Sequence, residues 1–257
     1  MSDILDNRTP ERSLAQRIRT ILQSSEMARF AVGYFFLSGF EAIADSLGNL
    51  NELRLLIGNT SSQQTIEQLA EGYRRLELVR GVLEGQVYRK RSEAKAWAEG
   101  TAINIRVGME VMDQTDEGES LVASLAQMIE AGRLKVRIYT KGRLHAKAYI
   151  FDYGTVYDTS GRVVPRTEAG IAVVGSSNLS LAGISHNTEL NVLVHGNDNH
   201  ADMVQWFDAL WNEAEDFDQI LMDELQQSWA AAPVRPYDIY MKTLYALVKD
   251  RVEGDPD

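Results

Sequence analysis

Apolar and polar positions recur along this chain with two periods, and the changes of period predict where helices and strands lie. The triplet Thr9-Pro10-Glu11 is typical of a helix start, and apolar residues then recur at helical spacing to about Ser25. A second stripe predicts a helix over residues 116–131, which Gly132 can terminate. Further helices are expected from about Ser62, around Met203–Trp211, around Phe217–Leu225 and over Tyr237–Val248.

Between these helices lie segments with the pattern of strands. Leu134, Val136 and Ile138 alternate with polar positions, a period of two that is typical of a half-buried strand. Apolar runs bounded by turn residues predict more strands at Phe30–Leu37, Leu53–Ile57, Leu144–Phe151, Ile171–Val174 and Glu189–Val194. Because strands and helices are interspersed, the chain is expected to fold as an α/β unit with helical additions.

The domain boundaries are expected to enclose almost the whole chain. Residues 1–250 are predicted to form one domain, with a motif core at 133–195 and C-terminal helices at 198–250. Residues 251–257 are acidic and rich in turn formers, so we expect a tail or linker there.

Composition narrows the class of protein. Hydrophobic residues make up 44% and charged residues 25% of the chain, which is ordinary for a globular protein. No apolar run approaches the roughly 20 residues of a membrane span, and no secretory signal is evident, so a cytoplasmic protein without membrane contact is expected. With no cysteine there can be no Cys-based zinc site, and none of the four histidines forms the HExxH pattern of a zinc peptidase. No cofactor is expected.

Charge is unevenly distributed. The formal net charge of −11 argues against a protein that coats nucleic acid over its whole surface. One stretch is nevertheless purely basic, with Arg133, Lys135, Arg137, Lys141, Arg143 and Lys147 and no acidic residue among them. An anionic ligand could be drawn there, and Arg137, Lys141 and Arg143 are candidate nucleic-acid contacts. Another basic run, Arg89-Lys90-Arg91 near Trp97, is more typical of a solvated helix face.

The sharpest chemical pattern lies at the end of this basic stretch. His145-Ala146-Lys147 followed by Asp152 reads HxKxxxxD, and Gly175-Ser176-Ser177-Asn178 reads GSxN. If Leu144 and Ala146 face the core of a strand, His145 and Lys147 project together from its other face, about 7 Å apart, and a phosphate could bridge them. Gly175 permits close backbone approach, and Ser176 and Asn178 supply neutral donors for phosphoryl oxygens.

This pair of motifs resembles the signature of the phospholipase D superfamily, closely over about Arg143 to Val194. Glu189 lies eleven residues beyond Asn178, where nucleases of the family place a carboxylate that orients the histidine. The resemblance implies a mixed β-sheet flanked by helices and a metal-independent phosphodiesterase. His145 would attack phosphorus and form a phosphohistidine, while Lys147, Ser176 and Asn178 hold the phosphoryl oxygens. Asp152 belongs to the catalytic motif but is expected to buttress the strand.

In that family a second histidine, from a second motif, protonates the leaving group. This chain has one motif, so a homodimer that shares one active site is expected. The other histidines, His186, His195 and His200, are interpreted as structural.

Three functions remain open from the sequence. A nuclease acting on DNA, favoured over RNA, fits the basic strand that leads into His145. A non-catalytic nucleic-acid-binding or regulatory module is the alternative, because similar domains precede Swi/Snf-type helicases in bacterial proteins linked to phage defence. The helicase would then lie on a missing C-terminal part or a separate chain, since no GxxxxGK[ST] loop is present. A phospholipase or phosphatidyl transferase is the third.

Two segments are expected near this site. About 15 inserted residues, 153–167, are predicted to form a hairpin beside it, in contact with substrate or the other subunit or with neither. Phe35 and Phe36 could approach the pocket, although core packing is the favoured interpretation.

Overall fold

A computed structural model describes residues 3–35, 37–58, 101, 102, 105, 115–231, 240, 241, 243 and 244. The helix predicted from Ser62, the segment with Arg89-Lys90-Arg91 and Trp97, and Phe36 lie outside the described residues. Most of the predicted helix at Tyr237–Val248 and the 251–257 tail lie outside them as well.

The described part of the chain is built on a mixed sheet of eight strands in the order β1-β9-β8-β5-β2-β3-β4-β10. Its strands are β1 (Ile4–Leu5), β2 (Ser25–Val32), β3 (Glu52–Gly58), β4 (Leu134–Tyr139), β5 (Ala148–Tyr153), β8 (Gly170–Gly175), β9 (Asn191–Val194) and β10 (Glu215–Asp216). The neighbours β2, β3 and β4 are parallel, whereas β5, β8, β9 and β1 pair antiparallel in turn. The expected α/β fold with a mixed sheet flanked by helices is confirmed.

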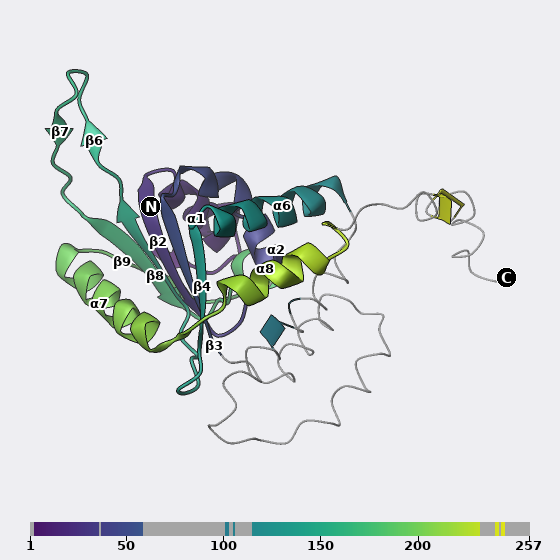
Figure 1. The fold of residues 1–257 in the computed structure, drawn as a ribbon. Coiled ribbons are helices and arrows are strands. Elements are labelled where there is room, and N and C mark those ends of the chain that lie inside the picture. Colours follow the sequence, from purple (N-terminus) through teal and green to yellow (C-terminus); the bar gives the residue numbers. More distant parts are fainter. Residues whose placement is uncertain are drawn as a thin grey trace.

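Helices cover both faces of this sheet (Figure 1). One face packs against α1 (Leu14–Leu22), α2 (Leu37–Glu41), α6 (Asp116–Glu130) and α8 (Asp218–Gln227), and the other against α7 (Asn197–Glu213). The described residues also include three short helical turns, η1 (Pro10–Arg12), η2 (Ala44–Asn49) and η3 (Ala182–His186).

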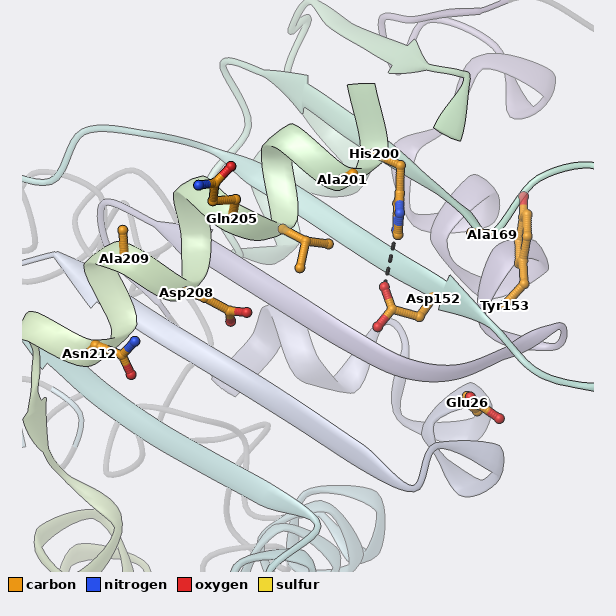
Figure 2. A pocket seen from close by; sticks show the side chains of 11 residues that line it. Glu26, Asp152, Tyr153, Ala169, His200, Ala201, Gln205, Asp208, Ala209 and Asn212 are labelled. Carbon is orange, nitrogen blue, oxygen red and sulfur yellow. Dashed lines mark ion pairs between the residues drawn. The ribbon is translucent and has the colours of Figure 1, made fainter. Parts of the chain in front are cut away.

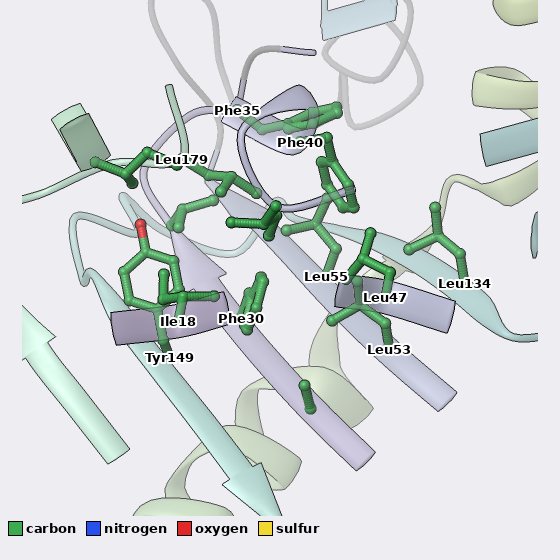
Figure 3. Close-up of a cluster of buried hydrophobic side chains, with 14 of the residues drawn as sticks. Ile18, Phe30, Phe35, Phe40, Leu47, Leu53, Leu55, Leu134, Tyr149 and Leu179 are labelled. Carbon is green, nitrogen blue, oxygen red and sulfur yellow. The ribbon is translucent and has the colours of Figure 1, made fainter. Parts of the chain in front are cut away.

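The larger core lies on the face opposite α7. Figure 3 shows Phe30 of β2 and Tyr149 of β5 among the aliphatic side chains of this cluster, and their rings meet edge to face at 5.0 Å. A smaller cluster under α7 contains Leu144, Ala148 and Ile150, with Ala146 packed against it. Leu144 and Ala146 therefore face a core together, as the sequence predicted.

Helix ends follow their capping residues. Ser13, rather than Thr9, caps α1 by accepting from the backbone N–H of Gln16, while Pro10 begins a separate 3-10 turn. Thr115 caps α6, and Gly132 follows that helix with φ of +67°, as its predicted terminating role requires.

Several strands differ from their predicted bounds, and two of the differences lie beside the motif residues. The first strand ends at Val32 rather than Leu37, because the N–H groups of Gly33 and Tyr34 bond a side chain instead of a neighbouring strand. Its partner β5 accordingly starts at Ala148 rather than Leu144, since Ala31 opposite Ala148 is the last pair between them. Phe35 is buried in the core and bridges Leu179, as the favoured interpretation held.

The inserted residues 153–167 form the predicted hairpin, but its predicted position beside the motif residues is wrong. Its strands are β6 (Val156–Tyr157) and β7 (Val163–Val164), and it projects away from the rest of the molecule (Figure 1). The hairpin joins the end of β5 to the start of β8, whereas the motif residues lie where β5 begins and β8 ends. Antiparallel pairing puts these two places at opposite ends of the strands, roughly 17 Å apart at about 3.4 Å per residue.

Candidate active site

The two motifs meet at one end of the central strands. His145 and Lys147 lie in the segment that enters β5, and Ser176 and Asn178 lie in the loop that leaves β8. Antiparallel pairing of Ala148 with Val174 brings these segments together, and the N–H of Gly175 donates to the carbonyl of Lys147 at 3.1 Å. The topology therefore assembles HxK and GSxN into a single cluster.

Lys147 is the buried basic residue of the cluster. It is only 6% exposed, and its Nζ donates to the carbonyl oxygen of His145 at 3.0 Å. Burial lowers the pKa of Lys147, and the carboxylate of Glu189 opposes this change. The site thus contains a fixed, partly desolvated amine beside an acidic group.

Asn178 is oriented by the end of β2. Its side chain is buried, and Oδ1 accepts from the backbone N–H groups of Gly33 at 3.0 Å and Tyr34 at 3.3 Å. These two bonds assign the oxygen, so the Nδ2 group is the part of the amide that can donate to a phosphoryl oxygen. A Cβ at Gly33 would lie 3.2 Å from Oδ1 and 3.8 Å from Nζ of Lys147, so glycine leaves room for both groups.

Ser176 and Glu189 form a hydrogen-bonded pair across the loops after β8 and before β9. The Ser176 hydroxyl donates to the Glu189 carboxylate and accepts from the N–H of Leu190 at 3.1 Å. No hydrogen bond joins Glu189 to His145 among the described residues. The carboxylate lies beside Ser176, and its charge raises the pKa of Lys147.

His145 is exposed, as is Ser176, whereas Lys147 and Asn178 are buried. The positive charge of Lys147 lowers the pKa of His145 most, followed by partial burial and the charge of Arg143. A lowered pKa keeps the imidazole neutral at neutral pH, and only the neutral ring has a lone pair for nucleophilic attack. Pairing of β5 with β8 brings an imidazole, an amine, an amide and a hydroxyl to the same end of these strands, and the last three are groups that can donate to phosphoryl oxygens.

Glycine at 175 serves a close contact within the protein. A Cβ there would collide with the Asn191 side chain and the Leu190 carbonyl oxygen. Asn191 is fully buried, and its Nδ2 donates to the Ser177 hydroxyl at 2.9 Å, while Tyr149 donates to the Ser177 carbonyl at 2.9 Å. Together these bonds hold the GSxN loop in place.

Sequence reasoning missed this support. Tyr149 lies two residues after Lys147, a spacing that puts both side chains on the same side of an extended chain, and this spacing was the available signal for Tyr149. Gly33 and Asn191 carry no comparable signal, because their roles depend on contacts between segments far apart in the chain.

Asp152 lies away from the cluster, at the far end of β5. Its carboxylate pairs with Nη1 of Arg29 at 2.6 Å and with Nε2 of His200 at 3.1 Å. Figure 2 shows His200 and Asp152 facing each other, beside a pocket of about 760 Å³ that they line with Glu26 and Asp208 among others. The structure thus gives Asp152 partners in β2 and α7 rather than in the motif loops.

Most residues of the basic stretch contact other parts of the protein. Arg133 donates to backbone carbonyls before β3, and Lys135 pairs with Glu52 at 2.6 Å. Arg137 donates to the Trp211 carbonyl and lies over its ring at 4.8 Å, so it supports α7. Exposed Lys141 lies 3.9 Å from a Glu213 oxygen.

Arg143 differs from these residues, because it is exposed and its charge acts on His145. It is consequently the basic candidate that the structure brings nearest to the site.

The remaining histidines have protein partners. His200 is buried and its Nε2 lies 3.1 Å from the Phe151 carbonyl oxygen. His195 lies between Asp3 and Glu168, and His186 contacts the Leu181 carbonyl at 3.4 Å. Within the described ranges no group of three or more His, Asp or Glu side chains could hold a metal ion, and no described helix is long and apolar enough to span a membrane.

Several solved structures are similar to this one. They include Nuc, a phospholipase D family member from Salmonella typhimurium (12% identity, 83% of this chain and 95% of Nuc covered, TM-score 0.43). NucT from Helicobacter pylori is 11% identical, with 83% and 97% covered and a TM-score of 0.42. Phosphatidylserine synthase from Haemophilus influenzae Rd KW20 is 15% identical, with 96% of this chain and 45% of that chain covered and a TM-score of 0.45.

No curated protein gives a significant match to the sequence. The family described as "Cardiolipin synthase, PLD-like domain" matches residues 18–211, a range that holds the HxKxxxxD and GSxN motifs and spans well over half of the chain. The chain therefore belongs to the phospholipase D superfamily, as the resemblance of its motifs implied.

Proposed function

We propose that this chain is a metal-independent phosphodiesterase that cleaves nucleic acid, with DNA favoured over RNA, through a phosphohistidine at His145. The observation that carries the proposal is the exposed His145 ring, with a lowered pKa, beside the buried amine of Lys147. Exposure lets the ring reach a polymeric substrate, and the lowered pKa keeps it nucleophilic at neutral pH.

Each residue has a distinct task in the proposed reaction. Nε2 or Nδ1 of His145 attacks phosphorus, the bond to the leaving oxygen breaks, and a phosphohistidine forms. Lys147 and the Nδ2 group of Asn178 offset the charge on the non-bridging oxygens, the role that a metal ion has in other phosphodiesterases. Water then attacks phosphorus and releases His145.

Protonation of the leaving oxygen requires a further acid. A second His145 ring donates this proton, and then accepts one from the attacking water, if two chains pair about a two-fold axis with their motif loops together. Glu189 holds Ser176 in place and stabilises the charge on Lys147. In this proposal Asp152 has a structural task, because its partners are Arg29 and His200.

Incubation with labelled single- and double-stranded DNA, RNA and phosphatidylcholine in EDTA tests the proposal. Cleavage of nucleic acid in EDTA that is lost in His145→Ala supports it. His186→Ala is the matched control, since His186 is also exposed but lies in η3 outside the motif, and this variant should cleave normally.

Two other results would replace the proposal. Salt-sensitive DNA binding without cleavage would assign the chain to a binding or regulatory role, including one beside a helicase. Hydrolysis of phosphatidylcholine alone would assign it to phospholipids.

A further inference from the structure

Ser177, the third residue of the GSxN motif, is turned towards the protein. It is fully buried, whereas Ser176 before it is exposed. Its backbone N–H donates to Oδ1 of Asn191 at 3.3 Å, and its hydroxyl accepts from Nδ2 of Asn191 at 2.9 Å. Its carbonyl oxygen accepts from the Tyr149 hydroxyl at 2.9 Å. Two side chains, one from β9 and one from β5, therefore engage the N–H, the hydroxyl and the carbonyl of this single residue.

These bonds act on the two peptide groups that flank Ser177. Its N–H belongs to the peptide that joins it to Ser176, and its carbonyl belongs to the peptide that joins it to Asn178. Because a peptide group is planar, a hydrogen bond to its N–H or its carbonyl restrains rotation of the whole plane. Asn191 thus restrains the peptide on the Ser176 side, and Tyr149 restrains the peptide on the Asn178 side.

The position of the Asn178 amide depends on two sets of contacts. Its Oδ1 is held by the N–H groups of Gly33 and Tyr34 at the end of β2. Those bonds orient the amide but leave open where the backbone that carries it lies. The peptide held by Tyr149 sets that backbone position, so a rotation of this plane would move the Asn178 Nδ2 group relative to a phosphoryl oxygen.

The Tyr149 hydroxyl is suited to a permanent restraint. Its ring is fully buried among the apolar side chains of the larger core (Figure 3). Burial raises the pKa of Tyr149, so the hydroxyl stays protonated and able to donate throughout the neutral pH range. Loss of this donor would take a partner from a buried carbonyl oxygen, and the Ser177–Asn178 peptide could regain one only by turning.

We propose that Tyr149 and Asn191 are positioning residues of the candidate active site. Through the two peptide groups of Ser177 they set the place of the Asn178 amide, and both are fully buried, so they do not touch substrate themselves. This inference rests on the proposed function, in which the Asn178 Nδ2 group offsets charge on a phosphoryl oxygen. A displacement of about 1 Å in an active site can cost about 10²-fold in rate. Residues that fix such a donor therefore govern the chemical step more than the binding of a long substrate.

Tyr149→Phe tests the first positioning residue, because it removes the hydroxyl and keeps the ring in the core. Single-turnover cleavage of labelled DNA in EDTA should slow by about tenfold, while the DNA concentration that gives half the maximal rate changes by less than about threefold. In an Asn178→Ala background the same substitution should slow cleavage by less than about twofold, because the group that it displaces is already gone. Equal slowing in both backgrounds would overturn the role of Tyr149.

Asn191→Ala tests the second positioning residue in the same way. It removes two bonds to Ser177 and should slow cleavage by at least about tenfold, again only while Asn178 is present. Nδ2 of Asn191 also lies 3.4 Å from the Leu5 carbonyl oxygen, so this substitution weakens the contact between β9 and β1 as well. Ser177→Ala, which removes only the hydroxyl that accepts from Asn191, is the milder variant. Slowing by either variant that persists in full without the Asn178 amide contradicts the role of Asn191.

Ser25→Ala is the matched control for the loss of a buried hydroxyl. Ser25 is 4% exposed, and its hydroxyl donates to the Ile21 carbonyl at 2.8 Å, at the end of β2 far from the motif loops. This variant should lower the midpoint of thermal unfolding about as much as Tyr149→Phe does and leave cleavage per folded molecule unchanged. If both variants lose cleavage equally, the effect of Tyr149→Phe is general destabilisation and not positioning.

Binding of inorganic phosphate, followed by phosphorus NMR, separates a failure of this inference from a failure of the proposed function. Tyr149→Phe should weaken phosphate binding by about threefold when Asn178 is present and leave it unchanged in Asn178→Ala. That dependence in a protein that never cleaves a phosphodiester upholds the positioning role and rejects the proposed function. Cleavage in EDTA that shows no dependence on Asn178 rejects the positioning role alone. A chain that neither cleaves nucleic acid nor binds phosphate rejects both.

Discussion

The two ends of β5 hold the two ends of one sequence motif, yet they have different environments. At its start, His145 is exposed, and Lys147 donates to the carbonyl of His145, its one hydrogen-bond partner among the described residues. At its end, Asp152 is paired with Arg29 and His200, and Arg29 also lies 3.6 Å from Asp208. The candidate site residues therefore lie at one end, and a group of neighbouring charged side chains lies at the other. Residues of one sequence motif therefore need not lie in one site.

The largest effect is expected from a substitution at the start of β5, among the candidate site residues. Lys147→Met retains the length of the buried stem but removes the amine that, in the proposed reaction, offsets the charge on the phosphoryl oxygens. Cleavage should fall by about 10²–10³-fold, the usual cost of losing one electrostatic donor in an active site. Single-turnover cleavage of labelled DNA in EDTA measures this, and a loss below about threefold would show that Lys147 does not contact the reacting group.

The next largest effect is expected at the other end of β5, and it concerns stability. Asp152→Ala removes a carboxylate from Arg29, which is only 7% exposed, and should lower the free energy of unfolding by about 3 kcal/mol. Cleavage by the folded fraction should change little. Urea unfolding and cleavage rates per folded molecule check both expectations, and a large loss of activity at unchanged stability would place Asp152 in the chemistry.

A smaller effect concerns pH. Lys147 and Arg143 lower the pKa of His145, and the neutral ring is the active form, so the acid limb of kcat/KM should lie below pH 6.5. Arg143→Gln removes one of these charges and should move the limb to higher pH. The pH profiles of the wild type and Arg143→Gln measure it, with Lys141→Gln as the control, because Lys141 is not among the groups that shift His145.

The smallest effect is expected in the β6–β7 hairpin. Tyr157→Ser changes a residue that is 61% exposed, at the end of the sheet opposite the motif loops. Its free energy of unfolding should stay within about 0.5 kcal/mol of the wild type, and cleavage should be unchanged. A tenfold loss of cleavage would show that the hairpin acts at the site, as the sequence had predicted.

Local patterns predicted much of the fold. The alternation at Leu134, Val136 and Ile138 matches β4, whose residues are alternately buried and half-buried. Thr115 and Gly132 bound α6 through capping chemistry that involves only neighbouring residues. Such elements are predictable because their determinants lie within a few positions of each other.

The sequence by itself determined the chemical identities of the site, since HxKxxxxD and GSxN specify an imidazole, an amine, a hydroxyl and an amide. Tertiary structure decided which of them meet. Pairing of β5 with β8 brings Lys147 to Gly175 and sends Asp152 to the other end. The physical reason is that strand order and register are set by burial of the whole sheet between its helices, and no local pattern records that packing.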